Sequence, residues 1–227
     1  MRGEELEKLM LSFQFTRAFF DLLSIPRFHL LFLNLGPSGI FSGSRLRTFL
    51  TRLIGDRRIE DLKDPTLELA VSNLTRNCMQ MKREGSLVDF MIASLAVPLL
   101  FTVQRLDKED YVDGGVATET PFEQWLDDPS VHTILVHHIR HHEGRRFLPW
   151  WNATGVAASA HTVAATELFL KRRQLAAASG KQVIFLETQT IHPGIFQWKT
   201  ARNLIEAGAL TAAGLSSLRR PDGSSTV

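Results

Sequence analysis

The sequence predicts an α/β layered fold with a mainly parallel sheet, on three observations. Apolar runs typical of buried strands alternate with longer segments typical of helices. The 227 residues are 44% apolar, which is enough to build one sizeable core. Neither an internal repeat nor an interdomain linker interrupts the chain, so we expect one domain followed by a short polar tail.

The N-terminal third predicts two helices around an apolar segment. Apolar residues recur at helical spacing over residues 4–23, and Pro26 marks the expected end of that helix. The dense apolar segment 27–35 fits either a strand or a buried helix. Ser44 then caps a second predicted helix, which Gly55 closes.

The middle of the chain predicts two strands and a helix. Residues 66–73 are typical of a buried strand of a parallel sheet, and a shorter strand is expected over residues 78–82. Ser86 and Asp89 fit the capping box, in which each side chain satisfies a free backbone amide at a helix start. Pro98 halts that helix.

The C-terminal part alternates between strand and helix. A short helix is expected around Phe122 and Trp125, and Gly180 is a natural stop after the longest helix. The remaining predicted elements are a strand over residues 133–139, a helix over 156–178, a strand over 182–186 and a helix over 197–215.

One acidic residue lies in a pattern that suits catalysis, in the run Tyr-Val-Asp-Gly-Gly-Val from Tyr111 to Val116. An acidic residue at a strand end, followed by two glycines, can point its carboxylate into a cleft, because glycine lets backbone or substrate approach closely. An Asp-Gly pair between apolar residues is also a strong signal for a hairpin turn. The pattern alone leaves both interpretations of Asp113 open.

The run from Glu84 to Pro121 resembles the second half of the patatin-like phospholipase domain. It has an apolar helix containing Ala93-Ser94, a proline at its end, an apolar link and then Tyr-Val-Asp-Gly-Gly. Three further segments resemble parts of that domain: residues 39–46, the strand 184–186 and the helix 197–215. The resemblance covers most of residues 36–217 and is most specific over 84–121.

The resemblance implies a three-layer α/β/α domain with a mainly parallel sheet over residues 1–217. The composition of residues 218–227 predicts a disordered tail. It implies hydrolysis of phospholipid or acylglycerol esters by a serine and an aspartate, with no histidine and no cofactor. By that correspondence Asp113 is the base of the dyad, and Gly114 and Gly115 keep the approach to its carboxylate open.

The nucleophile of such enzymes lies in Gly-x-Ser-x-Gly, at a sharp turn between a strand and a helix. No serine of this sequence has both flanking glycines, and the glycine-rich loop that holds the oxyanion is also absent. We therefore expect an N-terminally truncated patatin-like domain, which carries no nucleophile and is inactive alone. The alternative is a non-catalytic fragment that binds lipid or a partner, or that associates with itself through an exposed sheet.

Composition and charge exclude several classes of protein. Lys+Arg number 26 and Asp+Glu 24, which is too balanced for a nucleic-acid-binding protein. The arginines between Arg45 and Arg58 form a local basic patch, which is either a solvated helix face or a contact for anionic lipid headgroups. The single cysteine, Cys78, excludes an internal disulfide. The apolar runs 28–35 and 90–103 are shorter than the roughly 20 residues of a membrane span. We expect a cytoplasmic or peripheral membrane protein.

Histidines cluster near the end of the strand predicted over residues 133–139. They are His137, His138, His141 and His142, and Glu143 follows them. These residue types bind zinc, so a histidine-based metal protein is a further alternative. Neighbouring residues on a strand point to opposite faces, however, and a built site usually takes its ligands from distant segments or from positions four apart. We predict no metal site.

Overall fold

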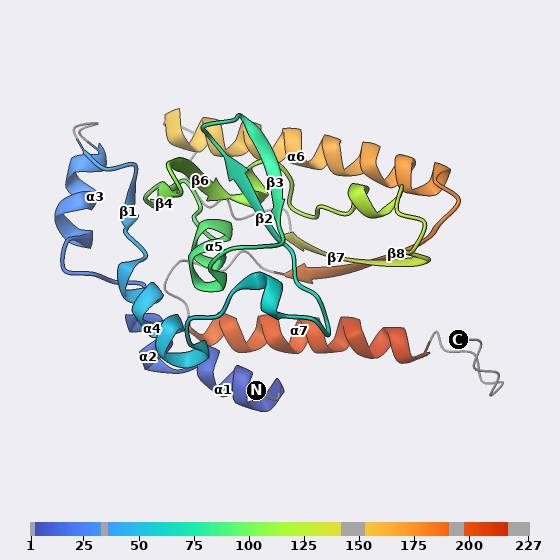
Figure 1. Cartoon of the computed structure of the whole chain (residues 1–227), viewed down its shortest axis with the longest axis horizontal. Coiled ribbons are helices and arrows are strands. Elements are labelled where there is room, and N and C mark those ends of the chain that lie inside the picture. The colour runs from blue at the N-terminus through green and yellow to red at the C-terminus, as the bar shows by residue number, and fades with distance from the viewer. Residues whose placement is uncertain (1–2, 33–35, 142–152, 191–197, 218–227) are drawn as a thin grey trace. The chain divides into compact units, whose positions relative to one another are not determined.

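The computed structural model of the chain describes residues 3–32, 36–141, 153–190 and 198–217 (Figure 1). These residues belong to two compact units, unit 1 over residues 1–119 and unit 2 over residues 120–227. Helices and strands alternate in both, which confirms the predicted mixed α/β composition. The strands of the described residues form three small sheets, of which the largest has four strands. The tail predicted over 218–227 lies outside the described residues.

Unit 1 begins with helices and then alternates between strands and helices. Its helices are α1 (Gly3–Met10), α2 (Phe13–Arg17), α3 (Ser24–Phe32), α4 (Ser44–Ile54) and α5 (Leu87–Ser94), with the 3₁₀ turns η1 (Ile59–Asp61) and η2 (Gly114–Val116). Its strands are β1 (Gly39–Phe41), β2 (Leu69–Asn73), β3 (Cys78–Lys82), β4 (Leu99–Phe101), β5 (Gln104–Leu106) and β6 (Glu109–Asp113).

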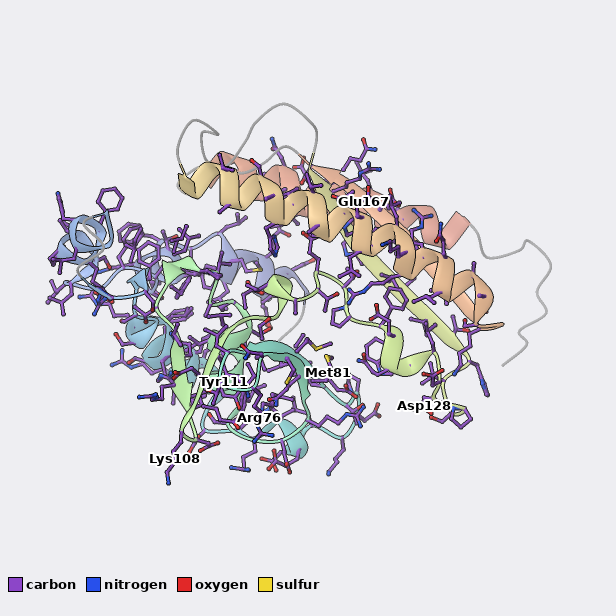
Figure 2. All side chains as sticks on the ribbon, turned by 90° about the horizontal axis from the view of Figure 1, so that it is seen from above. Arg76, Met81, Lys108, Tyr111, Asp128 and Glu167 are labelled. Atoms are coloured by element: carbon purple, nitrogen blue, oxygen red, sulfur yellow. The ribbon has the colours of Figure 1, made fainter. Side chains whose placement is uncertain are left out.

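The largest sheet has the order β3-β2-β6-β5 and is antiparallel throughout. The prediction that residues 66–73 form a strand of a parallel sheet is therefore wrong in the direction of pairing. The observed strand, β2, begins at Leu69. Short connections are the reason for the antiparallel pairing, because only residues 74–77 separate β2 from β3, and Asp107 and Lys108 alone separate β5 from β6 (Lys108 is labelled in Figure 2), whereas a parallel crossover needs a dozen residues or more. Both residues have a left-handed backbone, with φ of 49° and 68°, as a two-residue hairpin turn requires. The strand predicted over 78–82 is confirmed as β3.

Parallel pairing within the described part of unit 1 joins β1 to β4. Gly39 lies opposite Leu99 and Phe41 lies opposite Phe101. The expectation of a mainly parallel sheet does not describe unit 1, because its four-stranded sheet is built from antiparallel neighbours.

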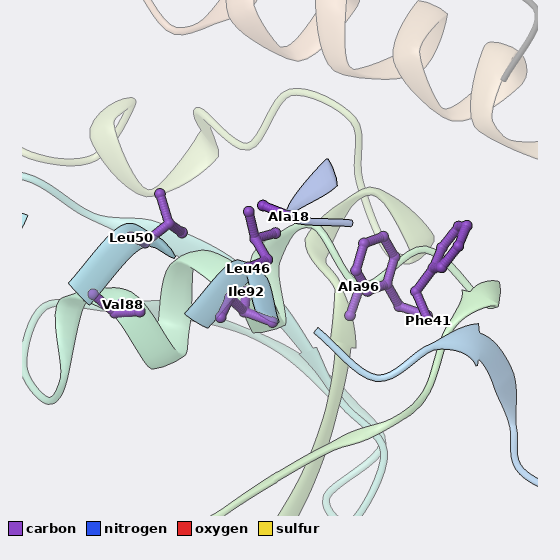
Figure 3. Close-up of a cluster of buried hydrophobic side chains, with 8 residues drawn as sticks. Ala18, Phe41, Leu46, Leu50, Val88, Ile92 and Ala96 are labelled. Atoms are coloured by element: carbon purple, nitrogen blue, oxygen red, sulfur yellow. The ribbon is translucent and has the colours of Figure 1, made fainter. Parts of the chain in front are cut away.

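Helix α5 lies at the centre of unit 1, because its apolar side chains contribute to two hydrophobic clusters. Its start is as predicted for Ser86, whose hydroxyl accepts a hydrogen bond from the backbone N–H of Asp89 at 3.3 Å. The Asp89 half of the predicted capping box is not formed, because the Asp89 carboxylate pairs with Arg47 of α4. The first cluster (Figure 3) contains Ala18, Phe41, Leu46, Leu50, Val88, Ile92, Ala96 and Phe101. The second contains Ile59, Val71, Leu87, Phe90, Ala93 and Tyr111. The helix therefore joins α4 and β1 on one side to the four-stranded sheet on the other.

The N-terminal helix differs from the prediction for residues 4–23. It is divided into α1 and α2, because the hydroxyl of Ser12 accepts a hydrogen bond from the N–H of Phe15 and starts a new helix there. Pro26 does not end a helix; it lies in the first turn of α3, where a backbone N–H is not needed. The apolar segment 27–35 is helical as far as Phe32, and residues 33–35 lie outside the described residues.

Unit 2 pairs two parallel strands and connects them through a long helix. Its elements are η3 (Glu123–Trp125), β7 (Thr133–His141), α6 (Ala153–Ala178), β8 (Gln182–Thr190) and α7 (Trp198–Ser217). The register runs from Thr133 opposite Gln182 to His141 opposite Thr190. These elements confirm the predicted strands and helices, and Gly180 follows α6 with a φ of +73°.

Helices cover both faces of this strand pair, with α6 on one face and α7 on the other (Figure 1). A hydrophobic cluster of Phe122, Ile134, Val136 and Ala176 fills the α6 side. On the α7 side, a ring nitrogen of His137 is hydrogen-bonded to Thr188 at 2.8 Å, and Thr188 donates to Thr211 of α7 at 2.8 Å. Unit 2 by itself is thus a small α/β/α layer.

Candidate active site

Asp113 is the last residue of β6, at the point where the strand ends against η2. Its strand neighbours Tyr111 and Val112 are buried, which fixes the direction of β6 up to its end. The N–H of Asp113 donates to the carbonyl of Ala96, just past α5, at 3.0 Å. One carboxylate oxygen accepts the N–H of Gly115 at 2.7 Å. The interpretation of Asp113-Gly114 as a plain hairpin turn is wrong, because η2 follows β6 and no strand folds back on it there.

The carboxylate of Asp113 is half-buried and has no compensating cation among the described residues. Burial raises its pKa above the ordinary value for aspartate, and the hydrogen bond from Gly115 opposes that rise. A carboxylate without an ion-pair partner keeps its capacity to take up a proton, which is the property that a general base requires.

The two glycines after Asp113 have different surroundings. Gly114 is buried, and a Cβ placed on it would lie 2.5 Å from the backbone oxygen of Ala70 in β2. A Cβ on Gly115 would instead lie 3.1 Å from the Oδ1 atom of Asp113. Gly114 therefore lets η2 lie against β2, whereas Gly115 leaves space beside the carboxylate.

A second carboxylate, Asp21, is held by a dense set of donors that sequence reasoning missed. The Arg27 guanidinium donates to both of its oxygens, at 2.7 and 2.8 Å, and the Ser42 hydroxyl donates to one at 2.6 Å. Burial alone would raise the pKa of Asp21, but these hydrogen bonds outweigh it and lower the pKa to about 2. A carboxylate that accepts this many hydrogen bonds is a poor base. Its hydrogen bonds instead join the turn before α3 to the turn before α4.

The short spacing between Asp21 and Ser24 is the one local signal for this arrangement. The N–H of Asp21 donates to the Ser24 hydroxyl at 3.1 Å, as an N-terminal helix turn allows. Ser42, in contrast, is 21 positions away, and no pattern in the sequence links it to Asp21.

The clustered histidines are divided between the faces of β7, as the strand geometry predicted. His137 bonds Thr188 on the α7 side, and His138 stacks on Phe169 of α6 with ring centroids 4.0 Å apart. Within the described ranges, no group of three or more potential ligands is arranged to hold a metal ion. His142 and Glu143 lie outside these ranges.

These features define a mixed α/β protein with a half-buried, uncompensated carboxylate where a strand meets a tight glycine turn. The sequence model of the patatin-like phospholipase family matches residues 1–126, more than half of the chain and including Asp113, Gly114 and Gly115. The chain therefore belongs to the patatin-like phospholipase family, which indicates a lipid acyl hydrolase kind of function. Comparison with curated proteins gave no match. None of the described helices is both long enough and apolar enough to cross a membrane.

Proposed function

We propose that the chain serves the hydrolysis of lipid acyl esters, with Asp113 as the general base of a serine–aspartate dyad. The single observation that carries this proposal is the position of its carboxylate, half-buried at the end of β6 without an ion-pair partner in the described residues. Family membership supports the reaction class, because the matched residues include Asp113 and both glycines. We extend the patatin-like domain to residue 217 and assign it a three-layer architecture.

In the proposed reaction, a serine oxygen attacks the carbonyl carbon of the ester while its proton passes to a carboxylate oxygen of Asp113. The same proton then passes to the leaving alcohol, a lysolipid or glycerol moiety, as the ester C–O bond breaks. Water hydrolyses the acyl-serine by the same sequence, with Asp113 again taking and returning one proton. Gly115 keeps side chains away from the carboxylate at each step.

The proposal assigns to residues 1–227 the carboxylate half of the dyad. None of the serines lies in Gly-x-Ser-x-Gly, and Ser42, which does contact a carboxylate, contacts the strongly acidic Asp21. We propose that the nucleophile belongs to polypeptide outside these residues.

The test has two arms. The 227-residue chain is assayed with a p-nitrophenyl acyl ester, and we expect no hydrolysis above the buffer rate. The codons before Met1 are then read in frame for Gly-x-Ser-x-Gly, and any longer product that contains it is assayed with Asp113→Asn. We expect the variant to lose roughly 10³- to 10⁴-fold in turnover.

The possible results distinguish the role of Asp113 from the position of the nucleophile. Hydrolysis by the 227-residue chain that Asp113→Asn abolishes would leave Asp113 as the base but show that the nucleophile lies within the chain. A longer, active product that keeps full turnover with Asp113→Asn would overturn the role of Asp113.

A further inference from the structure

We propose that the turn between α2 and α3 is a docking surface for an anionic lipid bilayer. Leu22 and Leu23 form this turn, and Ile25 and Phe28 follow on α3 at positions three apart, which share one helix face. All four side chains are exposed, and Leu22, at 85%, is more exposed than any other large apolar side chain of the described residues. We call these four residues the apolar tip.

The apolar tip lies at the edge of unit 1. Figure 1 places α3 beside β1, away from the four-stranded sheet. An exposed group of large apolar side chains is costly in water, and such groups usually mark a binding surface. The exposed surface of the tip can therefore contact a flat surface without rearrangement of the sheet.

Hydrogen bonds to Asp21 hold the turn that carries the tip. The N–H of Leu23 donates to the Asp21 carboxylate at 2.9 Å, and the same carboxylate binds Arg27 within α3 and Ser42 before α4. Leu22 and Leu23 are thus fixed between two anchored residues before any contact is made. A surface that is already ordered loses little conformational entropy on binding.

The charge around the tip is positive, which complements anionic headgroups. Residues 11–54 contain the arginines 17, 27, 45, 47 and 52 but a single acidic residue, Asp21. Arg27 pairs with Asp21 and Arg47 pairs with Asp89 of α5, so the positive charge comes from Arg17, Arg45 and Arg52. Arg45 and Arg52 are exposed, lie seven positions apart on one face of α4, and have no carboxylate partner among the described residues. The Arg45 guanidinium also donates to the carbonyl of Phe20 at 2.9 Å, which places it beside the tip.

Apolar side chains that project from a hydrogen-bonded turn, with Arg45 next to them and Arg52 further along α4, fit the boundary between headgroups and acyl chains. The apolar groups enter the acyl region while the guanidinium groups remain at the level of the phosphates. A bilayer therefore satisfies both features at once, whereas a second copy of the chain would bring arginines against arginines. Binding of this kind does not require turnover, so it stands independently of the proposed dyad.

The test measures co-sedimentation of the 227-residue chain with vesicles. One set is phosphatidylcholine alone, and the other contains about one fifth phosphatidylserine. We expect binding to the second set, weakened by added salt. Leu22→Ser with Ile25→Ser should weaken it about tenfold or more, because two apolar side chains no longer enter the bilayer. Arg45→Gln with Arg52→Gln should weaken it about tenfold on the anionic vesicles alone.

The matched control replaces exposed leucines elsewhere, Leu175→Ser with Leu210→Ser, since these side chains are 59% and 75% exposed. This variant should bind as the wild type does. We expect every variant to fold, because none of the replaced side chains is buried, and circular dichroism checks this. Absence of wild-type binding, or equal binding by the tip variant, would overturn the proposal. So would light scattering that shows a wild-type dimer which the tip variant dissociates, because the tip would then be a contact between copies.

Discussion

At the residue scale, Asp113 and Asp21 have carboxylates whose different surroundings shift their pKa values in opposite directions and suit them to different roles. Asp21 accepts charged and neutral donors on both oxygens, so it stays ionised and serves the fold. Asp113 accepts one backbone N–H and is half-buried, so its ionised form is held less favourably. A group kept in a mildly unfavourable state is a frequent property of functional sites.

Asp113→Asn should therefore leave the protein as stable as the wild type at pH 7, or up to about 1 kcal/mol more stable. The raised pKa means that ionised Asp113 costs stability in the folded state, and asparagine removes the charge while its Oδ1 still accepts the Gly115 N–H. The wild type should gain relative stability as the pH falls through the raised pKa, so the difference should shrink in acid. Urea unfolding at pH 7 and pH 4 measures it. A clear loss of stability in the variant would make Asp113 a structural residue.

Gly114→Ala should destabilise the protein by about 2 kcal/mol or more, since the new methyl group would meet the backbone of Ala70 at 2.5 Å and the paired strand β2 cannot move away cheaply. Gly115→Ala is the matched comparison, because its methyl group would meet only the Asp113 carboxylate at 3.1 Å. We expect less than about 1 kcal/mol there. Thermal unfolding of both variants is the measurement, and equal losses would contradict the different roles assigned to the two glycines.

The sequence motif predicted Asp113, Gly114 and Gly115 as the candidate site, but not what each glycine touches. Gly114 lies against Ala70, which is 44 positions earlier in the sequence and is brought there by the pairing of β2 with β6. Asp21 was missed for the same reason, because its partner Ser42 belongs to another element. Short motifs identify residue types, whereas contacts between distant segments depend on the folded sheet.

At the scale of elements, helix limits were predicted best where capping residues mark them. Ser86 starts α5 and Gly55 ends α4 as expected, because both act through local backbone hydrogen bonds. The prediction that Ser44 caps α4 is wrong, because Gly43 holds the N-cap position and Ser44 is the first residue of the helix. Strand pairing was predicted less well, since a buried strand has the same apolar pattern in parallel and antiparallel sheets. The antiparallel pairing of β5 with β6 depends on the two-residue connection at Asp107 and Lys108. Both residues have a left-handed backbone, which this pair of residue types does not predict as strongly as Asn-Gly or Asp-Gly would.

The turn between α2 and α3 should lose stability in acid because of Asp21. Its pKa is about 2 in the folded state, against 3.8 for an unperturbed aspartate. The stabilisation is thus fully present above pH 4 and is lost as the pH falls towards 2, by about 2 kcal/mol. Asp21→Asn should lower the stability at pH 7 and flatten the dependence on pH between 4 and 2, as measured by urea unfolding.

The control for this acid effect is Asp110→Asn, which removes an ion pair with the largely exposed Arg105. Exposed pairs contribute little, so we expect a change below about 1 kcal/mol and an unchanged pH dependence. If Asp21→Asn and Asp110→Asn behaved alike, the network around Asp21 would not be what fixes the turn.

At the scale of the whole molecule, the division into two units coincides closely with the extent of the family match. Unit 1 ends at residue 119 and the match at residue 126. Both clusters that contain α5 and the complete four-stranded sheet belong to unit 1. Composition gave no sign of this division, because residues 115–125 contain no glycine-rich or charged linker.

Residues 1–119 expressed alone should therefore unfold cooperatively, whereas residues 120–227 alone should not. The described part of unit 1 has two hydrophobic clusters, a four-stranded sheet and the β1–β4 pair. The described part of unit 2 has one cluster and a single parallel pair, which is marginal by itself. Circular dichroism during heating is the measurement, because the four tryptophans all follow residue 119 and fluorescence would not follow unit 1. Should residues 1–119 lack a cooperative transition while the whole chain shows one, the two units would fold only together within the proposed domain over residues 1–217. The environment of Asp113 would then depend on residues beyond unit 1.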